Sequence, residues 1–270
     1  MLQHIPDAGN LATELEIIII DNNSSDNTKS VIHDFAKTCR YELIYGHCSD
    51  PGLSNARNSG IQKSNGEWIV FTDDDCYLDK DYFSQFAKEV DVNEFQFGSG
   101  QIKLFDPEDD PRIAKLTLKR RTLIPAFQFI QAGVVQGANM FFHRSVFDKT
   151  GFFNPLMGAG TPFACEDIEM ACRASLAGFR GAQIPELIVH HHHGRKLSSP
   201  EALETLEGYD TARGAYYASI LIQFGLKEIF DVWKEQTNND EQVLLQLARE
   251  FKGASDYISL VTSANCAALH

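Results

Sequence analysis

The sequence lacks the features that define several broad classes of protein. Its six cysteines form no C-x-x-C pair, so neither a zinc knuckle nor a disulfide framework is expected, and we interpret them as reduced thiols of a cytoplasmic protein. No apolar run approaches the roughly 20 residues that a membrane-spanning helix needs, and no signal-peptide pattern opens the chain. Lysine and arginine number 24 against 37 aspartates and glutamates, a net charge of −13. This charge argues against nonspecific binding to nucleic acid, so no nucleic-acid partner is predicted.

The first third of the sequence alternates between β-prone and helical segments. Residues 15–20, 41–45 and 68–72 are predicted strands, and residues 26–37 and 52–63 are predicted helices. This order is typical of a Rossmann-like α/β fold, with a mostly parallel sheet flanked by helices. The first strand is largely apolar, and we expect both of its faces to be buried. Ligands of such sheets bind beyond the carboxyl ends of the strands.

The rest of the chain predicts further strands and then a helical C-terminal extension. We divide it into a domain of residues 1–197 and an extension of residues 198–270, whose apolar helix faces pack on the sheet or on a partner, so a homodimer through these helices is a possible assembly. The other expected elements are helices at 80–90, 112–121, 166–177, 200–224, 226–236 and 241–260, strands at 96–105, 134–142 and 185–193, and a loop at 152–163.

Three consecutive carboxylates, Asp73, Asp74 and Asp75, follow the strand predicted at residues 68–72. Like charges this close repel one another unless a cation lies among them. A hard divalent ion such as Mg²⁺ or Mn²⁺ suits carboxylate oxygens. An acidic turn that caps the next helix is the alternative interpretation, but three acids at the end of one strand favour a metal or phosphate site.

Other polar residues are placed where they could share that site. Asp21 follows the first predicted strand, so one crevice could hold both Asp21 and the triplet. Arg57, early in a predicted helix, could clamp a phosphate, and a surface arginine is the alternative. Glu166 and Asp167 open a predicted helix, where acidic residues are also ordinary caps.

Four consecutive histidines end the strand predicted at residues 185–193. Because side chains alternate along a strand, His190 and His192 face one way and His191 and His193 face the other. At most one of these pairs can therefore face a given site. Their position inside the chain argues against an engineered tag.

Taken together, these motifs resemble the family 2 glycosyltransferases, which have the GT-A fold. Each motif is weak alone, but their order and spacing are specific, and the resemblance covers residues 15–195. The matching stretches are residues 17–28, 52–60, 71–75, 137–140 and 151–153, residues 166–169 with Arg173, and the strand that contains Pro185 and His191.

The resemblance implies an inverting transfer of a sugar from a nucleotide donor, with a UDP-sugar expected, to a hydroxyl of a glycan, lipid-linked or other acceptor in glycan or cell-surface polysaccharide synthesis. Asp167 matches the general base of the family. Asp75 matches its metal-binding carboxylate, for Mn²⁺ or Mg²⁺, and His191 best fits its histidine that contacts the metal or the diphosphate. The triplet leaves open whether Asp74 shares or takes the metal, and His193 lies on the same strand face as His191. The other matched positions are implied to bind the nucleotide-sugar: Asp21, Asn23, Arg57, Asp73, Asp74, Asn139 and Glu166.

One departure from the family pattern concerns the start of the chain. Family members normally have a further strand and helix there, whereas only residues 1–14 precede the first strand here. We therefore expect an N-terminally short GT-A domain, and a truncated, non-catalytic nucleotide-sugar or glycan-binding relic is the alternative function. A nucleotidyltransferase is disfavoured because the glycine-rich N-terminal phosphate loop that it needs is absent. The predicted location is the cytoplasm, with peripheral contact at the inner face of the membrane left open.

Overall fold

The strands form two separate sheets in the computed structural model, which describes residues 4–9, 14–236 and 240–267. A two-stranded sheet pairs β1 (Glu16–Asp21) in parallel with β2 (Glu42–His47). A six-stranded mixed sheet has the order β3-β7-β5-β8-β4, with β6 attached to β8; β5 and β8 are parallel and the other neighbours antiparallel. Its strands are β3 (Trp68–Phe71), β4 (Cys76–Leu78), β5 (Phe97–Leu104), β6 (Thr122–Ile124), β7 (Met140–His143) and β8 (Gly181–His191).

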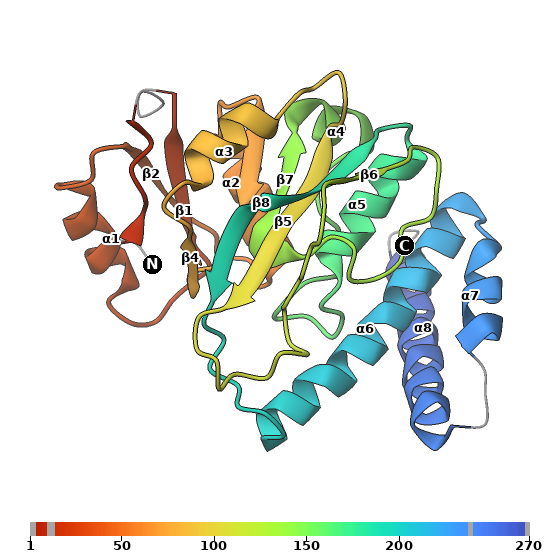
Figure 1. The fold of residues 1–270 in the computed structure, drawn as a ribbon. Coiled ribbons are helices and arrows are strands. Elements are labelled where there is room, and N and C mark those ends of the chain that lie inside the picture. Colours follow the sequence, from red (N-terminus) through yellow and green to blue (C-terminus); the bar gives the residue numbers. More distant parts are fainter. Residues whose placement is uncertain (1–3, 10–13, 237–239, 268–270) are drawn as a thin grey trace.

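The helices flank these sheets and then form a block of their own. Figure 1 shows β1, β2 and α1 at one side of the molecule, the six-stranded sheet in the middle, and α6, α7 and α8 at the opposite side. In the described residues, no helix has both the length and the apolar character needed to cross a bilayer. The helices are α1 (Thr28–Ala36), α2 (Leu53–Lys63), α3 (Tyr82–Glu89), the 3₁₀ turn η3 (Gly137–Asn139), α4 (Arg144–Thr150), α5 (Glu166–Leu176), α6 (Pro200–Phe224), α7 (Glu228–Gln236) and α8 (Glu241–Ala267).

The predicted α/β class and the helical C-terminal extension are confirmed. The helix predicted over residues 200–224 has those bounds because Ser199 caps its first turn, accepting a hydrogen bond from the Ala202 N–H, and Gly225 ends it in the left-handed conformation at φ 65°. The strand predicted at residues 134–142 is only partly correct: the backbone forms η3 first and becomes β7 at Met140.

The helix predicted over residues 112–121 is wrong. The backbone of Leu116 instead pairs with Ile102 of β5, with N–O distances of 2.9 and 3.1 Å in the two directions. Ile113 is buried and anchors this segment to the rest of the fold. Because the backbone hydrogen bonds of this stretch go to β5, a helix is not needed to satisfy them.

The expectation that β1 is buried on both faces is also wrong. Only Asp21 at its end is buried, and the isoleucines before it are half-buried. In the described residues β1 pairs with β2 alone and makes no ladder with the six-stranded sheet. Ile18, Ile19 and Ile20 therefore face a cavity between the two sheets.

One hydrophobic core joins the sheet to the C-terminal helices. It contains Phe142 of β7 and Ile168 of α5 together with Tyr216 of α6 and Tyr257 of α8, so it crosses the predicted boundary between residues 197 and 198. The helices α6 and α8 touch backbone to backbone, since a Cβ on Gly214 would lie 1.8 Å from the Glu250 carbonyl oxygen. The division into residues 1–197 and 198–270 stays a prediction.

Candidate active site

A cavity of about 1250 Å³ lies between the two sheets. Its lining combines the end of β1, the turn that carries the acidic triplet, the start of α5 and the end of β8. Residues from α6 complete it. Six of the predicted site residues are brought together with His191 around this space, namely Asp21, Arg57, Asp73, Asp74, Asp75 and Glu166, and Asp167 joins them.

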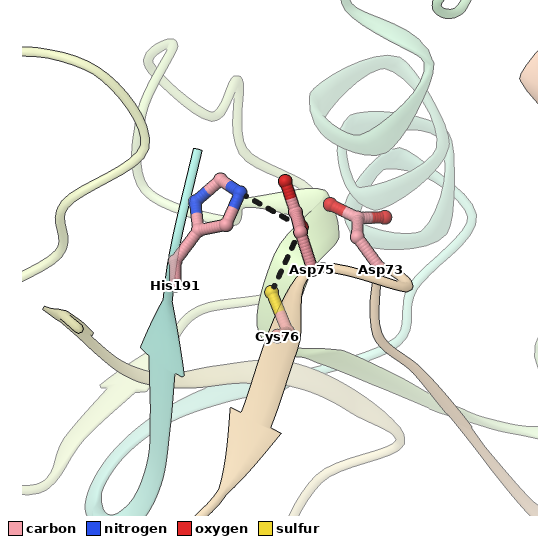
Figure 2. Close-up of side chains that lie close together, drawn as sticks. All are labelled: Asp73, Asp75, Cys76 and His191. Carbon is pink, nitrogen blue, oxygen red and sulfur yellow. Dashed lines mark hydrogen bonds and ion pairs between the residues drawn. The ribbon is translucent and has the colours of Figure 1, made fainter. Parts of the chain in front are cut away.

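The acidic triplet meets a histidine at one end of the cavity. β4 pairs antiparallel with β8 so that Cys76 lies opposite His191, and this register sets the imidazole beside the triplet. Figure 2 shows Asp73, Asp75, Cys76 and His191 converging, and their ligand atoms all lie within 4.8 Å of one another. The His191 Nε2 is 3.1 Å from the Asp75 Oδ1. Asp74 is exposed and lies outside this group, although it lines the cavity.

This cluster has the donor atoms that a hard divalent cation uses. Carboxylate oxygens and an imidazole nitrogen suit Mn²⁺ or Mg²⁺. The His191 Nε2 faces these carboxylates, so it is the ring nitrogen that can join them as a ligand. Burial raises the pKa of the Cys76 thiol, which therefore stays protonated and is a poor ligand. Asp73, Asp75 and His191 are the residues that fit such an ion.

The pKa shifts within the cluster also favour a bound cation. Burial raises the pKa of Asp73, and the charge of Asp75 adds to this. Burial also works against ionisation of Asp75 and His191, but the hydrogen bond between them lowers the pKa of Asp75 and raises that of His191. A cation among these groups would favour the ionised carboxylates.

Arg57 is tied to two carboxylates in the floor of the cavity. Its guanidinium forms an ion pair with Glu166, and its Nη2 lies 3.4 Å from the Asp73 Oδ1. The side chain is buried, and the rings of Phe71 and Phe153 lie within 6 Å of it. The structure gives the guanidinium carboxylate partners, so Arg57 holds Glu166 and Asp73 in place. The phosphate contact expected from the sequence stays a prediction.

Asp167 is held by the backbone at the start of α5. Its Oδ2 accepts a hydrogen bond of 2.7 Å from the Gly137 N–H, and its Oδ1 accepts one of 2.7 Å from the Ile168 N–H. Burial, together with the neighbouring charge of Glu166, raises the pKa of Asp167 to about 7. A carboxylate with that pKa can accept a proton near neutral pH.

The turn after β1 contributes one of its two predicted residues. Asp21 is buried and accepts hydrogen bonds from the Ser24 N–H at 2.8 Å and the Tyr45 hydroxyl at 3.1 Å, and these bonds lower its pKa. Asn23 is exposed, with φ 63°, and does not line the cavity. Its neighbour Asn22 does, and its side chain accepts a hydrogen bond from the Gly52 N–H, which ties this turn to the start of α2.

Asn139 does not reach the cavity. Its side chain is fully buried, donates to the carbonyls of Gln101 and Leu187 at 2.9 and 2.8 Å, and accepts from the Tyr82 hydroxyl at 2.8 Å. The side chain is therefore occupied within the core, and it is the backbone before it, at Gly137, that faces the site.

Three cavity residues were missed by the sequence reasoning. Arg195 lies four residues after His191 and lines the cavity, with no ion pair in the part of the chain that the structure describes. Tyr209 and Arg213 line it from α6. His193 is buried behind His191 and accepts a hydrogen bond from the Arg195 N–H, so of the two histidines on that strand face only His191 joins the cluster.

Comparisons with known proteins agree with this architecture. The family model described as Glycosyl transferase family 2 matches residues 8–151, more than half of the chain. The uncharacterized glycosyltransferase EpsJ of Bacillus subtilis is 32% identical over 93 residues, which cover 34% of this chain and 26% of that protein. The matched stretch is thus about a quarter of the relative's length.

Solved structures resemble the whole fold. The mannosyltransferase PcManGT from Pyrobaculum calidifontis, in complex with GDP-Man and Mn²⁺, matches with a TM-score of 0.59 at 16% identity, covering 95% of this chain and 72% of that one. GalNAc-T7 with UDP, GalNAc and Mn²⁺ matches with a TM-score of 0.51 at 17% identity, covering 92% of this chain and 51% of that one. At these identities the likeness shows the fold, and the predicted GT-A-type architecture is confirmed. On the match of residues 8–151, the chain belongs to glycosyl transferase family 2.

Proposed function

We propose that this chain transfers a sugar from a nucleotide-sugar to an acceptor hydroxyl, with inversion at the anomeric carbon and with a divalent metal. The observation that carries this proposal is the shared cavity. The Asp167 carboxylate, whose pKa is raised to about 7, lines the same space as the cluster of Asp73, Asp75 and His191. The proposed proton acceptor and the proposed diphosphate site therefore line one cavity.

The donor is proposed to lie along the wall from Asp21 to His191. In this proposal Asp21 contacts the base, and Asp73 and Asp74 contact the ribose and the phosphates. Asp75 and His191 would hold Mn²⁺ or Mg²⁺, which when bound neutralises the charge that builds on the leaving diphosphate. The two structural neighbours named above bind GDP-Man and UDP, each with Mn²⁺. We propose a UDP-sugar, with a GDP-sugar as the competing donor.

The chemistry then follows from what the side chains can do. Asp167 takes the proton from the acceptor hydroxyl as that oxygen attacks the anomeric carbon in line, which inverts its configuration. The Gly137 and Ile168 N–H groups fix the orientation of the carboxylate. Arg57 keeps Glu166 in place beside it. Arg195, which carries no ion pair in the described residues, is available to the leaving diphosphate.

The acceptor is proposed to be a hydroxyl of a glycan or lipid-linked saccharide in polysaccharide synthesis. A homodimer through the C-terminal helices also stays a proposal, as does a peripheral place at the membrane. A second function is binding without transfer. The observation that favours it is the separation of β1 and β2 from the six-stranded sheet, which leaves Asp21 on a strand with one partner.

One experiment separates these two functions. UDP- and GDP-sugars are incubated with Mn²⁺ and the released nucleotide is measured, alongside calorimetry of UDP and GDP binding. For an enzyme, Asp167→Asn lowers turnover about 10³-fold or more and keeps nucleotide affinity, while Asp75→Ala lowers both. Nucleotide binding without turnover in the wild-type protein supports the binding function. Equal activity in the wild type and both variants contradicts the proposed roles.

A further inference from the structure

The cavity has a wall that the motif-bearing part of the chain does not supply. Tyr209 and Arg213 both line it from α6, one helical turn apart and therefore on one face of that helix. This helix begins at Pro200, beyond the stretch of residues 8–151 that the family model matches. The α6 face is thus a further side of the cavity, and α6 packs against α5, the helix that carries Asp167.

The Tyr209 hydroxyl is the open polar group on this face. In the described part of the chain no protein group hydrogen-bonds it. Two other tyrosines of the helical block do have such a bond: the Tyr216 hydroxyl donates to the Ile130 carbonyl at 2.5 Å, and the Tyr257 hydroxyl accepts from the Asn154 side chain at 3.0 Å. The Tyr217 hydroxyl, like that of Tyr209, has none in the described residues. Tyr209 is half-buried and lines the cavity, so its hydroxyl is open to a ligand there. A ligand bound in the cavity can supply the hydrogen-bond partner of the Tyr209 hydroxyl.

The surroundings of Tyr209 make it a neutral hydrogen-bonding group. Burial and the nearby charge of Asp167 raise its pKa to about 12, so the phenol keeps its proton at physiological pH. Its neighbour Arg213 is already paired, with the Asp210 Oδ1 at 2.5 Å and the Glu250 Oε1 at 2.7 Å. The α6 face therefore offers a ligand one hydroxyl and one aromatic ring, while the positive charge of Arg213 is balanced by its two carboxylate partners.

We propose that the α6 face at Tyr209 is the subsite for a neutral, polyhydroxylated acceptor, and that the Tyr209 hydroxyl hydrogen-bonds the acceptor next to the hydroxyl that Asp167 deprotonates. A saccharide fits this chemistry, because its hydroxyls can donate to and accept from the phenol while a C–H face of its ring rests on the aromatic ring. This proposal rests on the proposed function and assigns its acceptor side.

The test measures how the donor sugar is partitioned between two acceptors. The protein is given its UDP- or GDP-sugar with Mn²⁺ in water and in molar glycerol, and the ratio of glycosyl-glycerol to free sugar is measured. The wild type is expected to favour glycerol beyond its share of the hydroxyl groups present. Tyr209→Phe, which removes only the hydroxyl, is expected to lower that ratio about fivefold to tenfold, the effect of one hydrogen bond.

Two further measurements show whether Tyr209→Phe affects the acceptor or the donor. Donor hydrolysis and the Kd of the nucleotide with Mn²⁺ stay within about twofold of the wild type if Tyr209 acts on the acceptor alone. Tyr217→Phe on the same helix is the matched control, since Tyr217 packs in the core against Trp233, and its ratio stays unchanged.

The outcomes are distinct. An unchanged ratio in Tyr209→Phe, a wild type with no preference for glycerol, or a loss of nucleotide affinity equal to the loss in ratio overturns the acceptor subsite. A wild type that binds nucleotide but consumes neither donor overturns the proposed transferase and the subsite together. A lowered ratio with unchanged hydrolysis supports the subsite.

Discussion

Two walls of the same cavity are built in opposite ways. On the charged wall, buried and half-buried ionisable groups are bonded to one another or to the backbone, and the members are Arg57, Asp73, Asp75, Glu166, Asp167 and His191. On the isoleucine wall, half-buried apolar side chains stand on a strand with one partner, and the members are Ile18, Ile19 and Ile20.

The two walls differ in how many fixed polar contacts hold their side chains in place. Groups that stabilise charge in a transition state work best when they are fixed before the substrate arrives, and the charged wall meets that condition through contacts between β3, β4, α2, α5 and β8. The isoleucine wall contributes no charged group, and its strand forms a ladder with β2 alone in the described residues. We infer that chemistry depends on the first wall and that the second tolerates change.

The largest effect is expected from Arg57→Met. This change keeps an apolar stem between Phe71 and Phe153 but removes the guanidinium that pairs with Glu166 and Asp73. Two carboxylates are then left without their cation in a buried place, which should lower the free energy of unfolding by about 3–5 kcal/mol. Urea unfolding followed by circular dichroism measures this, and transfer activity should fall with it.

The matched change on the other wall is Ile19→Val. Ile19 lines the cavity but is only half-buried, so the loss of one methylene should cost about 0.5 kcal/mol, near the low end for such substitutions. If both variants lose the same stability, the two walls do not differ as described.

The second effect concerns the support behind the charged wall. Glu169, in the same helix as Asp167, is bonded to Arg173 at 2.9 Å and accepts a hydrogen bond of 3.1 Å from Gln223 of α6. The place of α6 is in turn set by α8. Gly214→Ala would put a Cβ 1.8 Å from the Glu250 carbonyl oxygen, so the helices must separate, at a cost of about 1–3 kcal/mol in unfolding free energy.

Gly208→Ala on the same helix is the control for this variant. A Cβ at Gly208 meets nothing within 4 Å, so the substitution should stabilise the helix by about 0.5–1 kcal/mol. Thermal unfolding of the two variants should therefore move in opposite directions. A Gly214→Ala protein as stable as Gly208→Ala would mean that the close contact between α6 and α8 is not what fixes α6.

Much of the charged wall could be predicted from the sequence because its signals are local. The triplet after the strand at residues 68–71 and the acidic start of α5 are contiguous motifs, and the alternation that separates His191 from His192 needs only the period of a strand. The sequence could not show which side chains are already ion-paired or hydrogen-bonded within the fold. Arg57 looks free to bind phosphate until its pairing with Glu166, 109 residues away, is known.

The features that the sequence did not reveal share one physical cause, which is long-range pairing. Residues 112–121 carry a helical pattern, but the hydrogen bonds between Leu116 and Ile102 decide their structure. Asn139 sits in a matching motif, yet Tyr82 and two carbonyls occupy its side chain. Tyr209 has no motif at all, since only the docking of α6 places it on the cavity that Asp167 also lines.

The third effect is a pH dependence set by the charged wall. The pKa of Asp167 is raised from 3.8 to about 7, first by burial and then by the charge of Glu166. The carboxyl therefore holds its proton until the pH approaches 7, and kcat/KM should rise about tenfold per pH unit below that point and level off above it. The same shift means that the free energy of unfolding falls as pH rises from about 4 to 7, because the folded state binds the extra proton.

Glu166→Gln tests the second cause of this shift. Removing the neighbouring charge should move the midpoint of the kcat/KM profile to lower pH, while burial keeps it above the ordinary value of 3.8. A profile that is flat between pH 5 and 8, or a midpoint that does not move, would exclude Asp167 as the base that titrates.

The smallest effect is expected on the β1 side, from Tyr45→Phe. This change removes the hydroxyl that donates to the Asp21 Oδ2 at 3.1 Å and leaves the bond from the Ser24 N–H in place. Asp21 keeps its hydrogen bonds to Ser24, so the Kd for UDP with Mn²⁺ should rise only about threefold. Turnover at saturating donor should not change, because Asp167 lies on the other wall.

Tyr41→Phe is the control: its hydroxyl donates to the Pro6 carbonyl at 2.6 Å, outside the cavity lining, and nucleotide affinity should stay that of the wild type. Calorimetry and steady-state kinetics on the two variants decide the point, since a loss of turnover as large as that in Arg57→Met would place the base-binding side in the same rigid unit as the charged wall.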